Sequence, residues 1–188
     1  MNVFDFDETI YRGDTGRNFY RYILRKHPRL WWRVPKGLAV AAGFAVKILS
    51  SAQFKDGFYP TFFPYIDVER ESKEFWELQK RQGRIKQWYL DMKQSSDVIT
   101  TASPECLVRP IVEELGVKLI GAEVDMATGR LVGRNNKDSE KVKNFRAVYP
   151  KAAIDEFYSD SRSDDPMAEL AKRAFIVRGD RILPWPKN

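Results

Sequence analysis

The chain has 188 residues, of which 43% are hydrophobic and 31% charged, a composition typical of a folded globular protein. Its single cysteine, Cys106, excludes an internal disulfide and a cysteine-built zinc site, and its single histidine, His27, excludes any site that needs two. A bound metal ion would therefore be held by oxygen atoms, which favours Mg²⁺. The net charge of +6 favours an anionic partner such as a phosphate, an acidic lipid or a nucleic acid.

The distribution of apolar residues argues against a membrane-spanning segment. The longest uncharged apolar run covers residues 37–46, whereas a spanning helix needs about 20 residues. No apolar segment opens the chain, because charged residues begin at Asp5. We therefore expect a cytoplasmic protein, with peripheral contact to the inner face of the membrane as a further option.

The first half of the chain predicts one strand followed by helices. Residues 1–7 form a short apolar segment that ends in acidic residues, which indicates a buried strand. Residues 14–93 carry aromatic and basic residues at helical spacing, and four prolines divide this stretch into short helices. Within it, residues 67–90 alternate acidic and basic side chains around apolar ones, which predicts an amphipathic helix pair. These residues are interpreted as a helical insertion after the first strand.

The second half predicts strands that alternate with helices. Ser103 stands before Pro104 as a helix N-cap, and Gly116 ends that helix. Strands are predicted over residues 97–101, 117–120, 152–158 and 175–177, helices over 104–115, 138–149 and 165–173, and a β-hairpin over 123–134. This alternation indicates an α/β fold with a Rossmann-like parallel sheet. The predicted core comprises residues 1–13 and 94–188.

Polar residues follow three of the predicted strands. Asp5 and Asp7 close the first strand and face the same side of it, because side chains alternate along a strand. The carboxyl ends of parallel strands meet at one edge of a sheet, where ligands bind. The other polar residues at these ends are Thr100, Thr101, Asp160 and Asp164, and Lys137 and Lys141 begin the helix before the last acidic strand.

These residues resemble the motifs of the haloacid dehalogenase-like (HAD) hydrolase superfamily, specifically its phosphoserine-phosphatase-like branch. The resemblance covers the predicted core and rests on four elements in the family's order. They are Asp5-x-Asp7-x-Thr9, Thr101-Ala102-Ser103-Pro104, Lys141, and Asp160-x-x-x-Asp164. The resemblance implies a Mg²⁺-dependent phosphatase whose inserted helices form a cap over the active site.

By resemblance, Asp5 is the nucleophile that carries an aspartyl-phosphate, and Asp7 is the general acid and base. Lys141 would offset negative charge on Asp5 and the phosphoryl group. Mg²⁺ would be held by the Asp5 carboxylate, the Asp7 backbone carbonyl and Asp160, while Asp164 would support the metal through water or hold Lys141. The expected phosphate-binding residues are Phe6, Thr101, Ala102 and Lys137.

Several alternatives stay open at this point. Lys137 competes with Lys141 for the lysine role, and Thr100 competes with Thr101 for contact with phosphate. A phosphotransferase of the same family is a second enzymatic interpretation. A third interpretation is a catalytically inactive, basic module that binds membranes or nucleic acid.

The cap is distinguished by its charge. Residues 15–60 hold nine lysine and arginine residues against one acid, Asp56, and include the pair Trp31-Trp32. The apolar run 37–46 is interpreted as an internal helix of the cap. The alternative is that this region docks on an anionic membrane, in which case the substrate is a lipid-linked rather than a small phosphomonoester. Nucleic acid is not favoured as a partner, because no known binding motif accompanies the charge.

Overall fold

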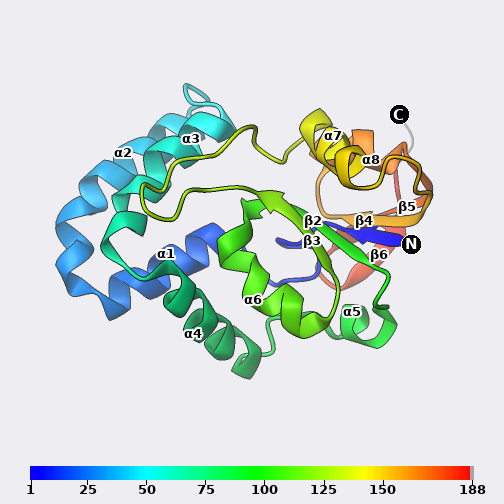
Figure 1. Cartoon of the computed structure of the whole chain (residues 1–188), viewed down its shortest axis with the longest axis horizontal. Coiled ribbons are helices and arrows are strands. Elements are labelled where there is room, and N and C mark those ends of the chain that lie inside the picture. The colour runs from blue at the N-terminus through cyan, green and yellow to red at the C-terminus, as the bar shows by residue number, and fades with distance from the viewer. Residues whose placement is uncertain (187–188) are drawn as a thin grey trace.

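The computed structural model describes residues 1–186 and contains a six-stranded sheet with strand order β3-β2-β1-β4-β5-β6 (Figure 1). The strands are β1 (Asn2–Phe4), β2 (Val98–Pro104), β3 (Lys118–Ala122), β4 (Ile154–Ser159), β5 (Ala171–Arg178) and β6 (Arg181–Pro184). The first five are parallel, and β6 pairs antiparallel with β5 at one edge. The predicted Rossmann-like parallel sheet is thereby confirmed.

The sheet positions β1 centrally, between β2 and β4. Val3 pairs with Val98 on one side and Phe157 on the other, and all three side chains are fully buried. Burial on both faces explains why residues 3–4 of β1 and 98–99 of β2 are consecutive apolar residues rather than alternating apolar and polar ones. The polar residues that follow β1, β2 and β4 therefore meet at one edge of the sheet.

Helices occupy the chain between β1 and β2, as expected for the insertion. They are α1 (Thr15–Lys26), η1 (Pro28–Arg33), α2 (Val34–Ala45), α3 (Ser51–Phe58), η2 (Tyr59–Thr61), η3 (Phe63–Tyr65), α4 (Val68–Arg81) and α5 (Gln87–Met92). Figure 1 shows α1 to α4 as a lobe to one side of the sheet, with α2 at its outer limit, whereas α5 lies near β6. The division into core and cap at residues 13 and 93 stays a prediction.

Aromatic side chains hold the lobe together and join it to the core. Phe19 and Phe75 meet edge to face at 5.5 Å between ring centroids, and Trp76 contacts Phe6 at 5.6 Å. The indole Nε1 of Trp76 also donates a hydrogen bond to the Leu107 carbonyl at 2.6 Å. Aromatic pairs of this kind contribute about 0.5–1.5 kcal/mol each beyond the area that they bury.

The remaining helices follow the strands of the core: α6 (Glu105–Leu115), α7 (Ser139–Val148), η4 (Arg162–Asp164) and α8 (Asp165–Ala168). The helix predicted to reach residue 173 is wrong in its end, because Ala171 already pairs with Ile154 in the sheet. Ser103 is not a helix N-cap, since β2 continues through it to Pro104. Gly116 ends α6 in a left-handed conformation, as expected.

The helix predicted over the apolar run is present as α2, but its interpretation as an internal helix of the cap is wrong. Gly37 is the only residue of α2 that is buried. The run has no polar face, so its sequence carries no indication of which side faces solvent. No helix within residues 1–186 combines the length and hydropathy needed to cross a bilayer.

The segment between β3 and α7 connects the core to α3, and we call residues 123–137 the bridging loop. Its predicted hairpin turn is confirmed by an antiparallel bridge between Val124 and Leu131. The Leu131 amide donates to Asp56 Oδ1 at 2.8 Å, and Asn135 Nδ2 donates to Ser51 Oγ at 3.1 Å. Because Ser51 and Asp56 lie on α3, the loop fixes the lobe over the edge of the sheet where β1, β2 and β4 end.

Candidate active site

A cavity of about 230 Å³ lies at the carboxyl ends of β1, β2 and β4. Its lining contains six carboxyl side chains and two lysines, together with the ends of β2 and β4. The charged members are Asp5, Asp7, Glu8, Asp14, Lys137, Lys141, Asp160 and Asp164. The structure therefore brings together the acidic and basic residues that the sequence analysis selected. The excess of carboxylates means that a phosphate anion needs additional positive charge to enter.

Lys141 is placed between two carboxylates. Its Nζ donates to Asp5 Oδ1 and to Asp164 Oδ2, both at 2.8 Å, and the lysine is 2% exposed. Burial lowers the pKa of Lys141, but Asp5 and Asp164 raise it by more, so that the lysine stays protonated. Burial raises the pKa of Asp5 to about 7; Lys141 opposes this shift, and the charge of Asp164 adds to it. The ammonium group thus leaves a net negative charge on the trio.

The Asp7 carboxylate is hydrogen-bonded by hydroxyl groups rather than by Lys141. Its Oδ1 accepts hydrogen bonds from the Thr15 amide at 2.8 Å and the Thr15 hydroxyl, and its Oδ2 accepts one from the Ser103 hydroxyl. Burial raises the pKa of Asp7 to about 6, with the charge of Asp14 adding to the shift and the hydroxyl donors opposing it. Asp7 is thereby placed to exchange a proton near neutral pH.

The Thr9 hydroxyl contacts both Asp5 and Asp160. Thr9 Oγ1 lies 3.1 Å from Asp5 Oδ2 and 3.5 Å from Asp160 Oδ1, and it accepts a hydrogen bond from the Asp160 amide at 2.9 Å. Burial raises the pKa of Asp160, and the charge of Asp164 raises it further. Two carboxylates held together in this way are typical of an oxygen-ligand site for a hard divalent cation.

Among residues 1–186, no three His, Cys, Asp or Glu side chains lie close enough to form a cation site by themselves. The expected set needs only two carboxylates, Asp5 and Asp160, with the Asp7 carbonyl as a third oxygen. The Asp164 carboxylate is engaged by Lys141 and by the Ser159 hydroxyl at 2.7 Å. An all-oxygen donor set of this kind suits Mg²⁺ by its chemistry, and Asp164 is positioned to hold the lysine.

The expected phosphate-binding residues differ in what they present to the cavity. Thr101, Ala102 and Lys137 line it. Thr100, the alternative to Thr101, is not part of the lining, and its hydroxyl accepts a hydrogen bond from Asn136 Nδ2 at 3.2 Å. The Phe6 side chain is fully buried against Tyr11, so only its backbone is available to a phosphate.

A sequence profile described as haloacid dehalogenase-like hydrolase matches residues 3–169, which includes both acidic strand ends. The chain belongs to the haloacid dehalogenase-like hydrolase family. This confirms the resemblance seen in the four motifs and assigns the protein to the hydrolases. No curated protein sequence matches the chain significantly.

Solved structures share the fold of this HAD-like hydrolase at low sequence identity. A Bordetella pertussis protein described as having unknown function is 18% identical, with a TM-score of 0.76, and the alignment covers 93% of this chain and 87% of that one. A phosphoserine phosphohydrolase-like protein from Francisella tularensis is 14% identical, with a TM-score of 0.61 and coverages of 93% and 86%. A phosphoserine phosphatase solved as a phospho-aspartyl intermediate analogue is 14% identical, with a TM-score of 0.55 and coverages of 92% and 83%.

The sequence analysis missed a lysine that reaches the site from the inserted helices. Lys55 on α3 is buried, and its Nζ donates to the Ala102 carbonyl and to Asn135 Oδ1. Burial lowers the pKa of Lys55 to about 7; the charge of Asp7 opposes this shift, while that of Lys137 adds to it. No motif surrounds Lys55, so only the general basic character of residues 15–60 pointed toward it.

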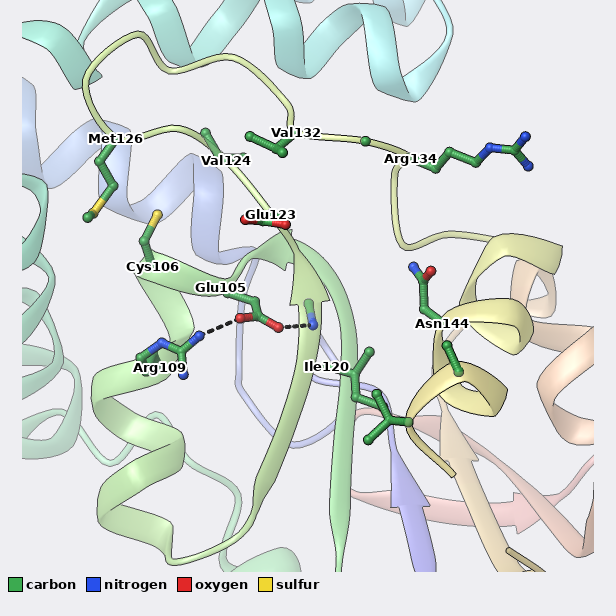
Figure 2. Close-up of a pocket in the computed structure, with 14 residues that line it drawn as sticks. Glu105, Cys106, Arg109, Ile120, Glu123, Val124, Met126, Val132, Arg134 and Asn144 are labelled. Atoms are coloured by element: carbon green, nitrogen blue, oxygen red, sulfur yellow. Dashed lines mark hydrogen bonds and ion pairs between the residues drawn. The ribbon is translucent and has the colours of Figure 1, made fainter. Parts of the chain in front are cut away.

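A second cavity of about 560 Å³ lies between α6, β3, the bridging loop and α7 (Figure 2). Two of its charged side chains form a pair, because Glu105 accepts a hydrogen bond from Arg109. Glu105 also accepts a hydrogen bond from the Gly121 amide. The adjacent Cys106 thiol has its pKa raised to about 12 by burial, which makes it unreactive at neutral pH. This cavity is larger than the acidic one but lacks its convergence of carboxylates and lysines.

Proposed function

We propose that this HAD-like hydrolase is a Mg²⁺-dependent phosphomonoester phosphatase that acts through an aspartyl-phosphate on Asp5. The observation that carries the proposal is the separation of two neighbouring carboxylates into different environments. Asp5 is paired with Lys141, whereas Asp7 is bound by the hydroxyls of Thr15 and Ser103. A pair of acids in distinct environments favours two distinct chemical roles.

In the first step, an Asp5 carboxylate oxygen forms a bond to phosphorus while the bond to the leaving oxygen breaks. Asp7 gives its proton to that oxygen, which its raised pKa favours. Lys141 stays protonated beside Asp5 and stabilises the charge on the entering group. The Thr101 hydroxyl, the backbone at Phe6 and Ala102, and Lys137 would hold the phosphoryl oxygens.

In the second step, Asp7 accepts a proton from water as the water oxygen attacks phosphorus. The bond between the Asp5 oxygen and phosphorus breaks, and inorganic phosphate leaves with Asp5 as a carboxylate. Asp7 is then protonated again for the next cycle. The lobe formed by α1 to α4 would exclude bulk water during these steps.

Mg²⁺ would be held by the Asp5 carboxylate, the Asp7 carbonyl and Asp160, with Asp164 acting on the site through Lys141 or water. When bound, it supplies positive charge to the phosphoryl group in a cavity lined by six carboxyl side chains. The phosphoserine phosphatases among the similar structures support a phosphomonoester as substrate. The substrate is either a small or a lipid-linked phosphomonoester. A cytoplasmic location stays a prediction.

Hydrolysis of p-nitrophenyl phosphate with and without Mg²⁺ tests the proposal. We expect Mg²⁺-dependent release of phosphate by the wild type, and a loss of at least roughly 10³-fold in Asp5→Asn. Asp91→Asn is the matched control, because Asp91 is an exposed aspartate on α5. Equal rates for the wild type and Asp5→Asn would refute the proposal and favour an inactive binding module.

A phosphotransferase is the second candidate, since the same aspartyl-phosphate can react with an alcohol. Adding glycerol to the assay separates the two candidates. Phosphate release to water should exceed phosphoryl transfer to glycerol for a phosphatase. The opposite ratio would reassign the enzyme while keeping the role of Asp5.

A further inference from the structure

The outer face of α2 and its flanking turns form an apolar surface, which we call the α2 surface. Five of its large side chains are among the most exposed apolar groups of the described chain. They are Trp31 (63% exposed), Trp32 (72%), Leu38 (61%), Val46 (65%) and Ile48 (76%). Pro35, Ala39, Ala42 and Ala45 are also exposed and add no polar group between them. Exposed apolar side chains gathered on one short segment are typical of an interaction site.

The opposite face of α2 is fixed against α3, so the exposed face is a stable feature of the fold. Val40 packs against Gly57, where an added Cβ would approach Val40 Cγ1 to 3.0 Å. The rings of Phe44 and Phe54 lie 4.9 Å apart between centroids. The helix therefore presents one side to the lobe and the other, apolar side to the surroundings.

Positive charge borders the α2 surface. Residues 28–50 contain four basic residues and no acidic one. They are Arg29, Arg33, Lys36 and Lys47, and none of them forms an ion pair within residues 1–186. The Arg33 guanidinium lies over the rings of Trp32 and Tyr65, at 4.7 and 3.9 Å from their centroids. Arg29, Lys36 and Lys47 are exposed and thus available to an anionic surface next to the tryptophans, whereas Arg33 is half-buried.

We propose that the α2 surface docks on an anionic lipid bilayer, with α2 lying in the plane of the interface. Apolar side chains would enter the acyl boundary while the surrounding basic residues face acidic headgroups. Tryptophan prefers this interface because its ring combines an apolar body with a polar N–H. A second copy of the chain is a poorer occupant, because a symmetric contact would bring the four cations of one copy near those of the other.

The position of α2 connects docking with the active site. Helix α3 connects the docked face with the acidic cavity, since it packs on α2 through Gly57 and contacts Ala102 through Lys55. The bilayer would therefore lie against the same lobe that covers the site. The docking proposal does not depend on the proposed phosphatase activity, and its test uses no catalytic readout.

Flotation of the protein with lipid vesicles tests the proposal. We expect the wild type to float with vesicles of phosphatidylcholine and phosphatidylglycerol in equal parts at low salt. Binding should weaken as salt rises and be much weaker with phosphatidylcholine alone. Replacing Lys36 or Lys47 with Gln should each lower the partition coefficient roughly fivefold at low salt.

The decisive pair of variants is Leu38→Glu and Val148→Glu. Both place one negative charge at an exposed apolar position, Leu38 on the α2 surface and Val148 at the end of α7. We expect Leu38→Glu to lower the partition coefficient at least roughly tenfold, and Val148→Glu to bind as the wild type does. Unchanged melting temperatures would show that both variants fold, as expected for exposed side chains.

Three outcomes would overturn the docking proposal. One is a wild type that does not float with the acidic vesicles at low salt. Another is equal loss of binding in the two glutamate variants, which would reduce the effect to net charge. The third is a wild-type dimer that Leu38→Glu converts to a monomer without vesicle binding, which would make the α2 surface an interface between copies.

Discussion

The core of the protein buries a cluster of charged side chains, whereas the inserted lobe exposes a group of apolar ones on the α2 surface. At the carboxyl edge of the sheet, Asp5, Lys141 and Asp164 are all buried and contact one another. On the lobe, Trp32 and Leu38 are exposed on the α2 surface. Each of these two features reverses the burial pattern that is usual in the rest of the molecule.

The two reversals have different energetic consequences. A buried ion pair contributes little net stability compared with apolar packing, but removing one partner is costly because the other charge stays buried. Replacing an exposed apolar side chain with a polar one costs no folding stability, unless a partner covers that side chain. Substitution in the core should therefore affect both stability and activity, whereas substitution on the α2 surface should leave both unchanged.

The largest effect is expected in the core, for Asp7→Asn. We expect kcat to fall by about 10²–10⁴-fold, because the variant cannot accept the proton from the attacking water in the second step, nor donate one to a leaving oxygen that needs it. Its side chain contacts Thr15 and Ser103, and its metal contact is the backbone carbonyl, so Mg²⁺ affinity should be retained. Steady-state kinetics and a calorimetric Mg²⁺ titration measure the two quantities. A variant that keeps its kcat but loses Mg²⁺ binding would contradict the assigned role.

Lys141→Met should lower the free energy of unfolding by about 3–5 kcal/mol, because Asp5 and Asp164 then face each other without a cation. Urea denaturation without Mg²⁺ measures the change. Lys143→Met is the matched control, since Lys143 is on the same helix but exposed, and it should change the stability by less than about 0.5 kcal/mol. Equal stabilities of the two variants would mean that Lys141 does not offset repulsion between Asp5 and Asp164.

A pair of glycine variants tests how closely the lobe contacts the core. Gly129 and Gly133 both lie in the bridging loop with left-handed φ angles, +73° and +71°. Alanine at either position costs about 1–2 kcal/mol for its conformation. At Gly129 the added Cβ would also lie 2.6 Å from the Tyr59 backbone, whereas nothing lies within 4 Å at Gly133.

We therefore expect Gly129→Ala to be less stable than Gly133→Ala by at least about 1 kcal/mol. Urea denaturation of the two variants provides the comparison. Indistinguishable midpoints and slopes would show that the bridging loop does not hold the lobe closely against the core.

A pH-dependent effect is expected inside the lobe, for Glu71→Gln. Burial raises the pKa of Glu71, but hydrogen bonds from Lys26 and His27 lower it by more, so its net pKa lies below the ordinary value. The carboxylate therefore contributes stability that is present above the ordinary glutamate pKa and is lost as pH falls through the lowered value.

Replacement by Gln should cost about 2 kcal/mol at neutral pH. The difference from wild type should shrink below about pH 4. Denaturation over a pH series measures both, and a difference that does not vary with pH would show that the Glu71 charge is not the source of the stabilisation.

Much of the catalytic cavity could be predicted from the sequence, because the acids stand directly after strands. Asp5, Asp7 and Asp160 are placed by the parallel sheet alone, since its carboxyl ends meet at one edge. The preference for Lys141 over Lys137 rests on the family resemblance and not on the local pattern. Both line the cavity, but only Lys141 is turned by α7 into contact with Asp5.

Other features depend on packing that local patterns do not encode. Ser103 precedes a proline and a glutamate, which is typical of a helix start, yet its hydroxyl binds Asp7 across the sheet edge. Lys55 reaches the site only because the bridging loop holds α3 there. The apolar run of α2 indicated burial by composition, but the direction of its exposed face depends on where α3 lies.

Trapping the covalent intermediate tests the central claim most directly. Asp7→Asn should slow hydrolysis of the aspartyl-phosphate, so acid quenching after mixing with p-nitrophenyl phosphate and Mg²⁺ should leave the phosphorylated enzyme. Tandem mass spectrometry is expected to place one phosphoryl group on Asp5 and none in Asp5→Asn. A phosphoryl group on another residue, or turnover by the wild type with no covalent species in any variant, would contradict the account.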